Sequence, residues 1–293
     1  MNILDRIKEE FPRLSKGQRH IADYILKNYD KAAYMTAAVL AKTVGISEST
    51  VVRFACALGY DGYPQMQKNF QEVIKNKLTN VQRLELMEGL SLEETIDEVF
   101  RMDIANLKNT REILNPKTLK QVVEKIANAR TVYILGTRSS SPLAQFLQYY
   151  MSYIIDNVKF INHGLNDIYS QALHADERDV VIGISYPRYS KITVDGMEYF
   201  RSKKCCVVAI TDNMEAPPAK LADYTLLAKS HMHSFVDSFV APLSLINMLI
   251  ILLGLKKKDE LVNNFTELEN TWQTLNIYAT KEIDNKFVEL EDK

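Results

Sequence analysis

The sequence predicts an all-α N-terminal domain followed by an α/β domain whose parallel sheet is flanked by helices on both faces. Residues 1–77 carry apolar side chains at helical spacing and contain no alternating run. From Thr131 onward, short β-branched runs alternate with helical stretches, and the strand segments are apolar almost throughout. The length of 293 residues suits two domains rather than one.

The composition is that of a globular protein, with 46% hydrophobic and 25% charged residues. The N-terminus carries charges from its fifth residue onward and lacks an apolar core segment, so we expect no signal peptide. The cysteines, Cys56, Cys205 and Cys206, show no disulfide framework. These features together predict a cytoplasmic protein.

Charge is divided unevenly along a chain whose net charge is −1. Residues 1–77 hold 12 Lys/Arg against 8 Asp/Glu, a net charge of +4, which leaves the remainder at −5. This asymmetry is expected if only the N-terminal part meets phosphates.

The N-terminal domain is expected to occupy residues 1–77. Glycines punctuate it at Gly45, Gly59 and Gly62, and a last helix begins near Pro64, which suits a first helical turn.

Residues 78–105 are expected to be a linker and connecting helix, and residues 106–293 the second domain. Ser91 and Glu94 form a predicted capping box that opens a long helix. Asn115 precedes a proline and is expected to cap the next helix.

The second domain is expected to alternate strands and helices. Strands are predicted at 131–135, 158–162, 179–185, 205–211 and 224–228. Helices are predicted between them at 142–155, 166–174, 190–203 and 216–222, and after them at 240–254 and 259–288.

The segment Val240–Leu255 is apolar enough to be considered as a transmembrane helix. It has 16 residues, fewer than the roughly 20 a bilayer requires, and it contains Pro242, Ser244 and Asn247. A buried helix is the better interpretation, and its excess apolar surface predicts a subunit interface. Trp272 and Tyr278 are expected to pack against a partner subunit or the sheet.

The segment Ala37–Phe54 resembles a helix-turn-helix. Ala41 is small enough for two helices to cross closely, Gly45 tolerates the positive φ of the turn, and Ser47 can cap the second helix. Apolar residues that would lock the helices together stand at the spacings of such motifs: Leu40, Val44, Ile46, Val51 and Phe54.

The second helix of this motif has a polar outer face. Val51, Phe54, Ala55 and Leu58 share one side, whereas Ser49, Arg53 and Ala57 lie opposite, with Thr50 on the flank. Short hydrogen-bonding residues with one arginine suit a major groove. We expect operator DNA to be contacted by Lys42, Ser47, Ser49, Thr50 and Arg53. The alternative is a helical hairpin used for dimerisation.

Two serine-rich loops follow predicted strands and precede helices, where hydroxyls and helix N–H groups can bind an anion. An arginine in the second loop can hold a phosphate through two N–H groups. The alternative is that these serines are ordinary helix caps. The expected ligand-binding residues are Gly136, Arg138, Ser139 and Ser140 in the first loop, and Ser185, Arg188, Ser190 and Thr193 in the second.

The second loop resembles the Ser-x-Ser-Gly-x-Thr phosphate loop of sugar isomerase (SIS) domains. Ser185 matches its first serine and Ser190 its threonine, while Pro187 and Arg188 replace the middle serine and the glycine. The first loop is similar to the SIS pattern Gly-x-Gly-x-Ser, with an arginine in place of the second glycine.

Both departures are of the kind found in RpiR/MurR-type regulators, in which a helix-turn-helix precedes an SIS domain. The segments 209–213 and 221–224 are similar to the same family. The resemblance implies a transcriptional regulator with a phosphorylated sugar as effector, a homodimer or tetramer, and no catalysis. We also expect no cofactor, no metal and no membrane partner.

Two other functions stay open. An SIS isomerase or lyase needs a general base, and His163 is the only candidate near the two loops, which contain no carboxylate. A regulator without a ligand, acting as a constitutive repressor, is supported only by Pro187. A metal at His231 and His233 would lack a clear third ligand.

Overall fold

The computed structural model describes residues 3–75, 79–85, 88–161, 167–232 and 234–278. Contacts divide the chain into two units. One comprises Met1–Asp103 together with His231–Asp237, and the other comprises Ile104–Ser230 together with Ser238–Lys293. The predicted boundaries of the linker, after residue 77 and after residue 105, stay a prediction. The return of seven residues to the first unit has no signal in the sequence.

The only regular secondary structure among the described residues of the first unit is helical, which confirms the predicted fold class. Its helices pack around one apolar core that includes Ile21, Leu40 and Phe54. Ser15 and Gln18 form a capping box at the start of α2, which the sequence analysis did not identify. The helices are α1 (Ile3–Glu10), α2 (Lys16–Lys27), α3 (Tyr29–Ala32), α4 (Ala37–Val44), α5 (Glu48–Ala57), α6 (Tyr63–Lys75) and α7 (Asn80–Glu85).

Two predicted helix caps on the way to the second unit are confirmed. Ser91 and Glu94 exchange the two hydrogen bonds of a capping box, at 3.2 and 2.8 Å, and α8 (Leu92–Ile113) follows. The side chain of Asn115 accepts hydrogen bonds from the first backbone N–H groups of α9 (Pro116–Ala127).

The second unit contains a five-stranded parallel sheet in the order β2-β1-β3-β4-β5. The strands are β1 (Val132–Gly136), β2 (Val158–Ile161), β3 (Val180–Ile184), β4 (Cys206–Thr211) and β5 (Tyr224–Leu227). They agree with the predicted strands to within one residue at most ends, while residue 162 lies outside the described residues. The strand order reverses at β1, because β2 and β3 lie on opposite sides of it.

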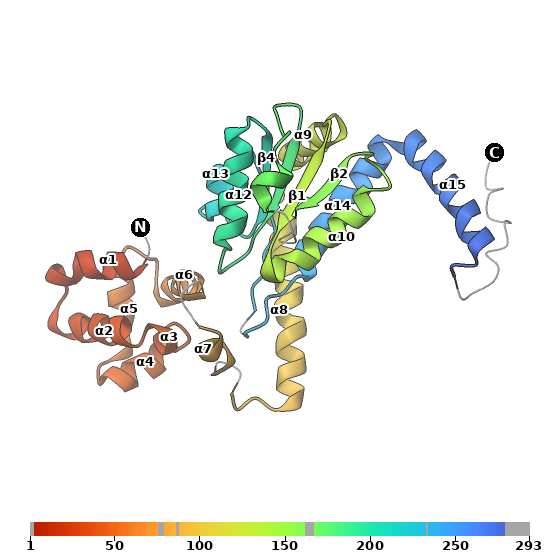
Figure 1. Ribbon diagram of the computed structural model, residues 1–293. Helices are drawn as coiled ribbons and strands as arrows, with labels where there is room; N and C mark the ends of the chain where they lie inside the picture. The colour runs from red at the N-terminus through yellow and green to blue at the C-terminus, as the bar shows by residue number, and fades with distance from the viewer. Residues whose placement is uncertain (1–2, 76–78, 86–87, 162–166, 233, 279–293) are drawn as a thin grey trace. The chain divides into compact units, whose positions relative to one another are not determined.

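Helices cover both faces of the sheet, as Figure 1 shows. Alternate residues of each strand enter two cores: Val132 and Ile134 pack beneath α9, α10 and α14, whereas Tyr133 and Leu135 pack beneath α11 and α12. The helices of this unit are α10 (Ser141–Met151), α11 (Ile168–Gln171), α12 (Lys191–Ser202), α13 (Pro217–Leu221), α14 (Val240–Lys256) and α15 (Lys258–Leu275).

Several predicted helix ends were wrong. The helix predicted to reach residue 155 ends at Met151, because the next residues form a turn in which the N–H of Ile154 donates to the carbonyl of Met151. The last helix ends at Leu275, where Asn276 adopts a left-handed φ of 49°, and residues 279–288 lie outside the described part. Among the described helices, no single one is long and apolar enough to cross a membrane.

Candidate functional site

The helix-turn-helix segment consists of α4, a tight turn and α5. Thr36 caps α4 through its side chain, and Gly45 ends it with a φ of +76°. A Cβ on Gly45 would meet nothing within 4 Å, so the turn requires glycine for its conformation and not for space. Leu40 and Phe54 are completely buried between the helices, as the motif predicts.

The polar face of α5 is exposed. Ser47, Ser49 and Arg53 are exposed, whereas Thr50 is half-buried. Ser47 occupies the N-cap position, but its side chain does not accept a backbone hydrogen bond as expected. Its hydroxyl instead contacts the hydroxyls of Ser49 at 2.9 Å and Thr50 at 2.8 Å, so the three form one cluster at the start of the helix. Lys42, on α4, is exposed as well.

Two features of this surface were missed by the sequence analysis. Val52 is 39% exposed beside Arg53, and an exposed apolar group on a reading helix can contact a thymine methyl. Gly17, in the first turn of α2, lies beside Thr50, since a Cβ there would stand 3.4 Å from the Thr50 methyl. The start of α2, with the exposed Lys16, is therefore next to the start of α5. Only the folded unit brings these helices together.

The second candidate site lies at the carboxyl edge of the sheet, between the loops after β1 and β3. These strands are neighbours at the point where the strand order reverses, which is where open parallel sheets bind ligands. The hydroxyl of Thr137 donates to Ser190 at 2.8 Å and lies 2.8 Å from the hydroxyl of Thr193. The two predicted loops are thus joined side chain to side chain. Thr137 was not among the predicted residues.

The predicted residues of this site divide by burial. Ser140, Ser185 and Thr193 are buried, with exposures of 4%, 2% and 0%. Arg138, Ser139 and Arg188 are exposed, and Ser190 is half-buried. The arginine side chains therefore lie at the rim of the site and the hydroxyls lie inside it. An anion entering from solvent would contact the arginines first.

The serines of these loops are not ordinary helix caps. Ser140 and Ser190 directly precede α10 and α12, yet neither side chain accepts a hydrogen bond from its helix. Ser185 accepts from the backbone N–H of Ser190 at 3.3 Å, a contact inside the loop.

Gly136 does not adopt the left-handed conformation of the first loop. The left-handed residue of the first loop is Arg138, with a φ of 54°. A Cβ on Gly136 would lie 2.8 Å from the Cβ of Ala144 and 3.0 Å from the carbonyl oxygen of Ser140. The glycine is therefore required because α10 packs closely on the end of β1.

A third loop, after β4, supports the second one. Tyr189 donates a hydrogen bond of 2.7 Å to the carboxylate of Asp212, and Asn213 donates to both at 3.0 and 2.9 Å. Thr211 donates to the backbone carbonyl of Ser185 at 2.8 Å. The sequence analysis placed no carboxylate beside the loops, but Asp212 stands here with its oxygens already engaged.

The candidate metal and base residues gain no support. Among the described residues, no three potential ligands gather, and His233 lies outside them. The candidate base His163 lies outside the described residues as well.

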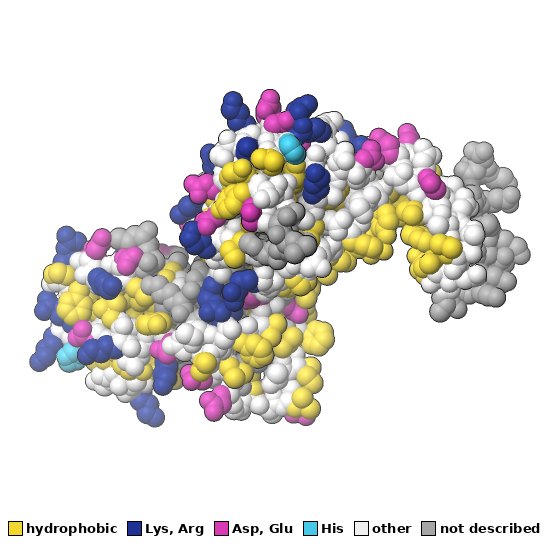
Figure 2. Space-filling model, in the orientation of Figure 1, with side chains coloured by type: hydrophobic (Ala, Val, Ile, Leu, Met, Phe, Trp, Pro, Cys, Tyr) yellow, Lys and Arg dark blue, Asp and Glu magenta, His cyan; other side chains and the backbone are white. Residues whose placement is uncertain are grey.

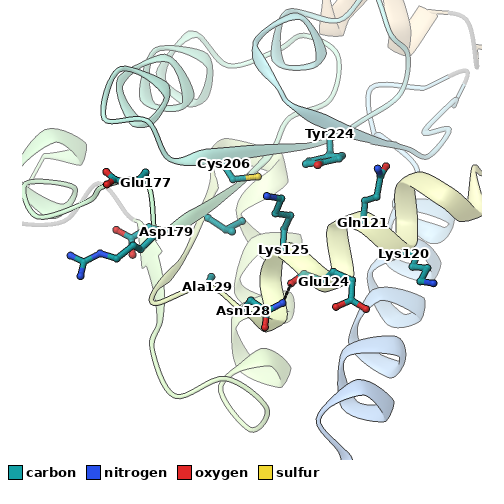
Figure 3. Close-up of a pocket in the computed structure, with 12 residues that line it drawn as sticks. Lys120, Gln121, Glu124, Lys125, Asn128, Ala129, Glu177, Asp179, Cys206 and Tyr224 are labelled. Carbon is teal, nitrogen blue, oxygen red and sulfur yellow. Dashed lines mark hydrogen bonds between the residues drawn. The ribbon is translucent and has the colours of Figure 1, made fainter.

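A cavity of about 590 Å³ lies at the opposite, amino-terminal edge of the strands (Figure 3). Charges of both signs line it, including Lys125 and Glu124 from α9 and Asp179 before β3. The carboxylate of Asp179 pairs with Arg130, so this charge serves the fold. The cavity is remote from the serine loops.

Comparison with known proteins identifies the family to which the two domains belong. Residues 1–77 match the helix-turn-helix domain of the rpiR family, and residues 125–252 match the SIS domain. The chain belongs to the RpiR family of transcriptional regulators.

Relatives resemble this RpiR-family chain over most of its length. An uncharacterized HTH-type transcriptional regulator of Haemophilus influenzae is 26% identical over 229 residues, covering 77% of this chain and 79% of that protein. The HTH-type transcriptional regulator HexR of Escherichia coli is 25% identical over 219 residues, covering 72% of each. The Vibrio vulnificus NanR protein, solved in complex with ManNAc-6P, shares the fold with a TM-score of 0.56 and 21% identity, covering 95% of this chain and 100% of that one.

Proposed function

We propose that this regulator binds operator DNA through α5 and that a phosphorylated sugar, bound between the loops after β1 and β3, changes its affinity for DNA. The hydrogen bonds between Thr137 and the second loop are the main support for the sensing role, because they bring two hydroxyl-rich helix starts to one point. The ManNAc-6P named for the Vibrio vulnificus NanR structure supports this ligand class.

The DNA contacts are assigned to Lys42, Ser47, Ser49, Thr50 and Arg53. All but Thr50 are exposed, and the hydroxyl cluster at the start of α5 offers donors and acceptors to base edges. The protein acts in the cytoplasm as a homodimer or tetramer, since two half-sites about one helical turn apart require two reading helices.

The ligand contacts are assigned to Gly136, Arg138, Ser139 and Ser140 in the first loop, and to Ser185, Arg188, Ser190 and Thr193 in the second. Buried hydroxyls would hold the phosphate, and the exposed arginines at the rim would bind its oxygens. Operator and effector affinities are then linked reciprocally.

The DNA half is tested by selecting operator fragments from genomic DNA and titrating them by fluorescence anisotropy at several salt concentrations. Arg53→Ala should weaken operator binding at least tenfold and leave sugar-phosphate binding unchanged. Arg13→Ala is the control, because Arg13 is exposed and pairs with Glu10, three residues before it. Equal affinities for Arg53→Ala and wild type at every salt concentration would refute the role of α5.

The sensing half is tested by thermal shift against a panel of sugar phosphates, because a ligand at about 100 times its Kd adds about 2.7 kcal/mol of stability. Ser185→Ala should abolish the shift and the response of DNA binding to the sugar. Ser202→Ala, at the other end of α12, should change neither, since its hydroxyl donates to the Tyr199 carbonyl within the same helix.

The enzymatic alternative is tested by assaying the same purified protein for sugar-phosphate isomerisation. Isomerisation requires a base beside the sugar carbon, and the Asp212 carboxylate is occupied by Tyr189 and Asn213. We expect no aldose–ketose interconversion with any sugar phosphate that binds. Turnover abolished by Asp212→Asn would make the protein an isomerase.

A further inference from the structure

Lys229 follows β5 and forms hydrogen bonds with two elements that are far from it in the sequence. Its neighbour Ala228 still pairs with the sheet, because the Ala228 N–H donates to the carbonyl of Thr211 at 2.9 Å. The N–H of Lys229 instead donates to the hydroxyl of Thr110 at 2.8 Å, and its ammonium donates to the carbonyl of Asp212 at 3.0 Å. These contacts join the last turn of α8 to the loop after β4. We call Thr110, Asp212 and Lys229 together the Lys229 bridge.

The Lys229 bridge is shielded from solvent. Figure 2 shows lysine and arginine side chains standing out from the surface of the molecule, where water solvates their charge. Lys229 is half-buried instead, and Thr110 is only 8% exposed. Leaving a shielded donor or acceptor without its partner costs free energy, so both hydrogen bonds restrict how α8 and the loop after β4 can move.

The Asp212 end of the bridge contacts the second of the two serine-rich loops. Tyr189 in that loop donates to the Asp212 carboxylate at 2.7 Å, and Thr211 donates to the backbone carbonyl of Ser185 at 2.8 Å. A ligand that fixes the second loop therefore also fixes Asp212, whose carbonyl accepts from Lys229. Hydrogen bonds thus run without interruption from the second loop to α8, as coupling between distant sites requires of a physical network.

The other end of the bridge adjoins two connections between the units. The chain passes between the units after residues 103, 230 and 237. Helix α8 contains the first of these points, and Lys229 comes just before the second. Residues 231–237 belong to the helical unit, where Asp237 pairs with Arg83 at 3.1 Å. Movement of Lys229 is therefore felt by two of the three segments that connect the units.

We propose that Lys229 is the positioning residue through which a ligand in the second loop acts on the helical unit. An occupied loop holds the Asp212 carbonyl in one position and an empty loop in another, and Lys229 passes this difference to α8 and to residues 231–237. Coupling between two sites typically changes an affinity by about 5–150-fold. The inference rests on the proposed function, because it names the residue that links effector affinity to operator affinity.

The test removes the ammonium and keeps the rest of the side chain. Lys229→Met retains the hydrocarbon stem and the N–H that donates to Thr110, but it lacks the donor to the Asp212 carbonyl. Lys229→Arg keeps a charged donor and is the rescue variant. Lys256→Met is the matched control, because Lys256 also joins two segments. It donates at 2.8 Å to Glu124 of α9, which lines the cavity at the amino-terminal edge.

The first measurement is the operator Kd of the full-length chain by fluorescence anisotropy, with and without saturating sugar phosphate. Wild type, Lys229→Arg and Lys256→Met should give the same ratio of the two Kd values, about 5–150-fold. Lys229→Met should bring this ratio below about twofold, while calorimetry finds its sugar-phosphate Kd within about threefold of wild type. A wild-type ratio in Lys229→Met would overturn the proposal. A ratio lost together with sugar-phosphate binding would also overturn it, because Lys229 would then serve the ligand site itself.

A second variant interrupts the same network at its other end. Tyr189→Phe removes the hydroxyl that donates to the Asp212 carboxylate. It should lower the ratio of the two operator Kd values at least about threefold at saturating sugar phosphate. The proposal therefore stays testable if Lys229→Met does not fold, and an unchanged ratio in Tyr189→Phe would contradict it.

Hydrogen exchange followed by mass spectrometry gives a measurement that needs neither DNA nor sugar. In Lys229→Met, the backbone amides of residues 211–213 and 228–230 should exchange about tenfold faster than in wild type, because the loop after β4 has lost its anchor. Lys256→Met should leave these rates unchanged. Equal rates in Lys229→Met and wild type would show that the ammonium does not hold the loop, which overturns the proposal.

The anisotropy measurement separates this inference from the proposed function. A wild type whose operator Kd does not respond to any sugar phosphate overturns both. A wild type and a Lys229→Met variant that respond equally leave the proposed function intact and overturn the inference alone. A response present in wild type and Lys229→Arg but absent in Lys229→Met supports both.

Discussion

Thr137 and Ser190 belong to different loops, and the hydroxyl of the first donates a 2.8 Å hydrogen bond to the second. Since Thr137 gives its proton to Ser190, the contact with Thr193 at 2.8 Å has Thr193 as donor. Because Ser190 accepts this hydrogen bond, its own hydroxyl proton is the one that the proposed ligand would meet. A chain of three hydroxyls thus orients one donor at the start of α12.

Thr137→Val should weaken sugar-phosphate binding about two- to tenfold, because one hydrogen bond of this kind contributes about 0.5–1.5 kcal/mol. Isothermal titration calorimetry with the sugar phosphate found by thermal shift measures the effect. Thr137→Ser should restore most of the affinity. Thr118→Val on α9 is the matched control, and equal losses in both valine variants would contradict a specific role for Thr137.

The sequence predicted two loops for the candidate site but not the hydrogen bonds that join them. Serines after apolar strands indicate a ligand edge, and both loops lie there. Thr137 was passed over because its partners are 53 and 56 residues away, and their contact depends on the register of β1 against β3. The packing role of Gly136 was not predicted, because the close approach of Ala144 appears only in the folded unit.

Tyr186→Phe should raise the free energy of unfolding by about 1 kcal/mol, because a buried hydroxyl without a partner is costly. Tyr186 is 3% exposed, its hydroxyl has no hydrogen-bond partner among the described residues, and burial raises its pKa well above the usual range. Chemical denaturation of the α/β unit measures the change.

The matched control is Tyr63→Phe in the helical unit. The Tyr63 hydroxyl donates to the carbonyl of Met35 at 2.7 Å, and burial raises its pKa to about 12. This variant should lose about 1 kcal/mol. A loss in Tyr186→Phe as well would mean that its hydroxyl has found a partner in solution.

Fold class and two of the helix caps could be read from local sequence, whereas contacts between distant segments could not. Ser91 and Asn115 cap helices as predicted because a cap involves only neighbouring residues. The return of His231–Asp237 to the first unit depends on a partner about 150 residues away, and no periodicity encodes it. The excess apolar character of α14 was visible in the sequence, but its exposure at Ile251 and Leu255 was not.

Asp176→Asn should destabilise the α/β unit at neutral pH, and the difference from wild type should vanish in acid. Hydrogen bonds from Arg178, first from its side chain and then from its backbone, and the charge of Arg130 hold the pKa of Asp176 below its usual range. A carboxyl with a lowered folded pKa stabilises above its unfolded pKa of about 3.9 and loses that contribution as pH falls further. Urea midpoints of both proteins between pH 7 and pH 3 should converge below about pH 4, and a constant difference would contradict this cause.

Asp237→Ala should lower the free energy of unfolding of the helical unit by about 3 kcal/mol, because it leaves a buried arginine charge without its partner. Arg83 and Asp237 pair at 3.1 Å, and their side chains are only 9% and 17% exposed. The pair holds the segment His231–Asp237 against α7 within this unit.

A double-mutant cycle measures the coupling energy between Arg83 and Asp237. Arg83→Met/Asp237→Leu should recover most of the loss, because replacing both charges by apolar groups removes the desolvation cost together with the attraction. The control pair is Arg13 and Glu10, whose arginine is 79% exposed, and its cycle should give a coupling energy of about 0–1 kcal/mol. Urea unfolding followed by helical circular dichroism measures all four corners of each cycle. If the losses at Arg83 and Asp237 simply add, the segment is held by other contacts, and the ion pair does not fix it to α7.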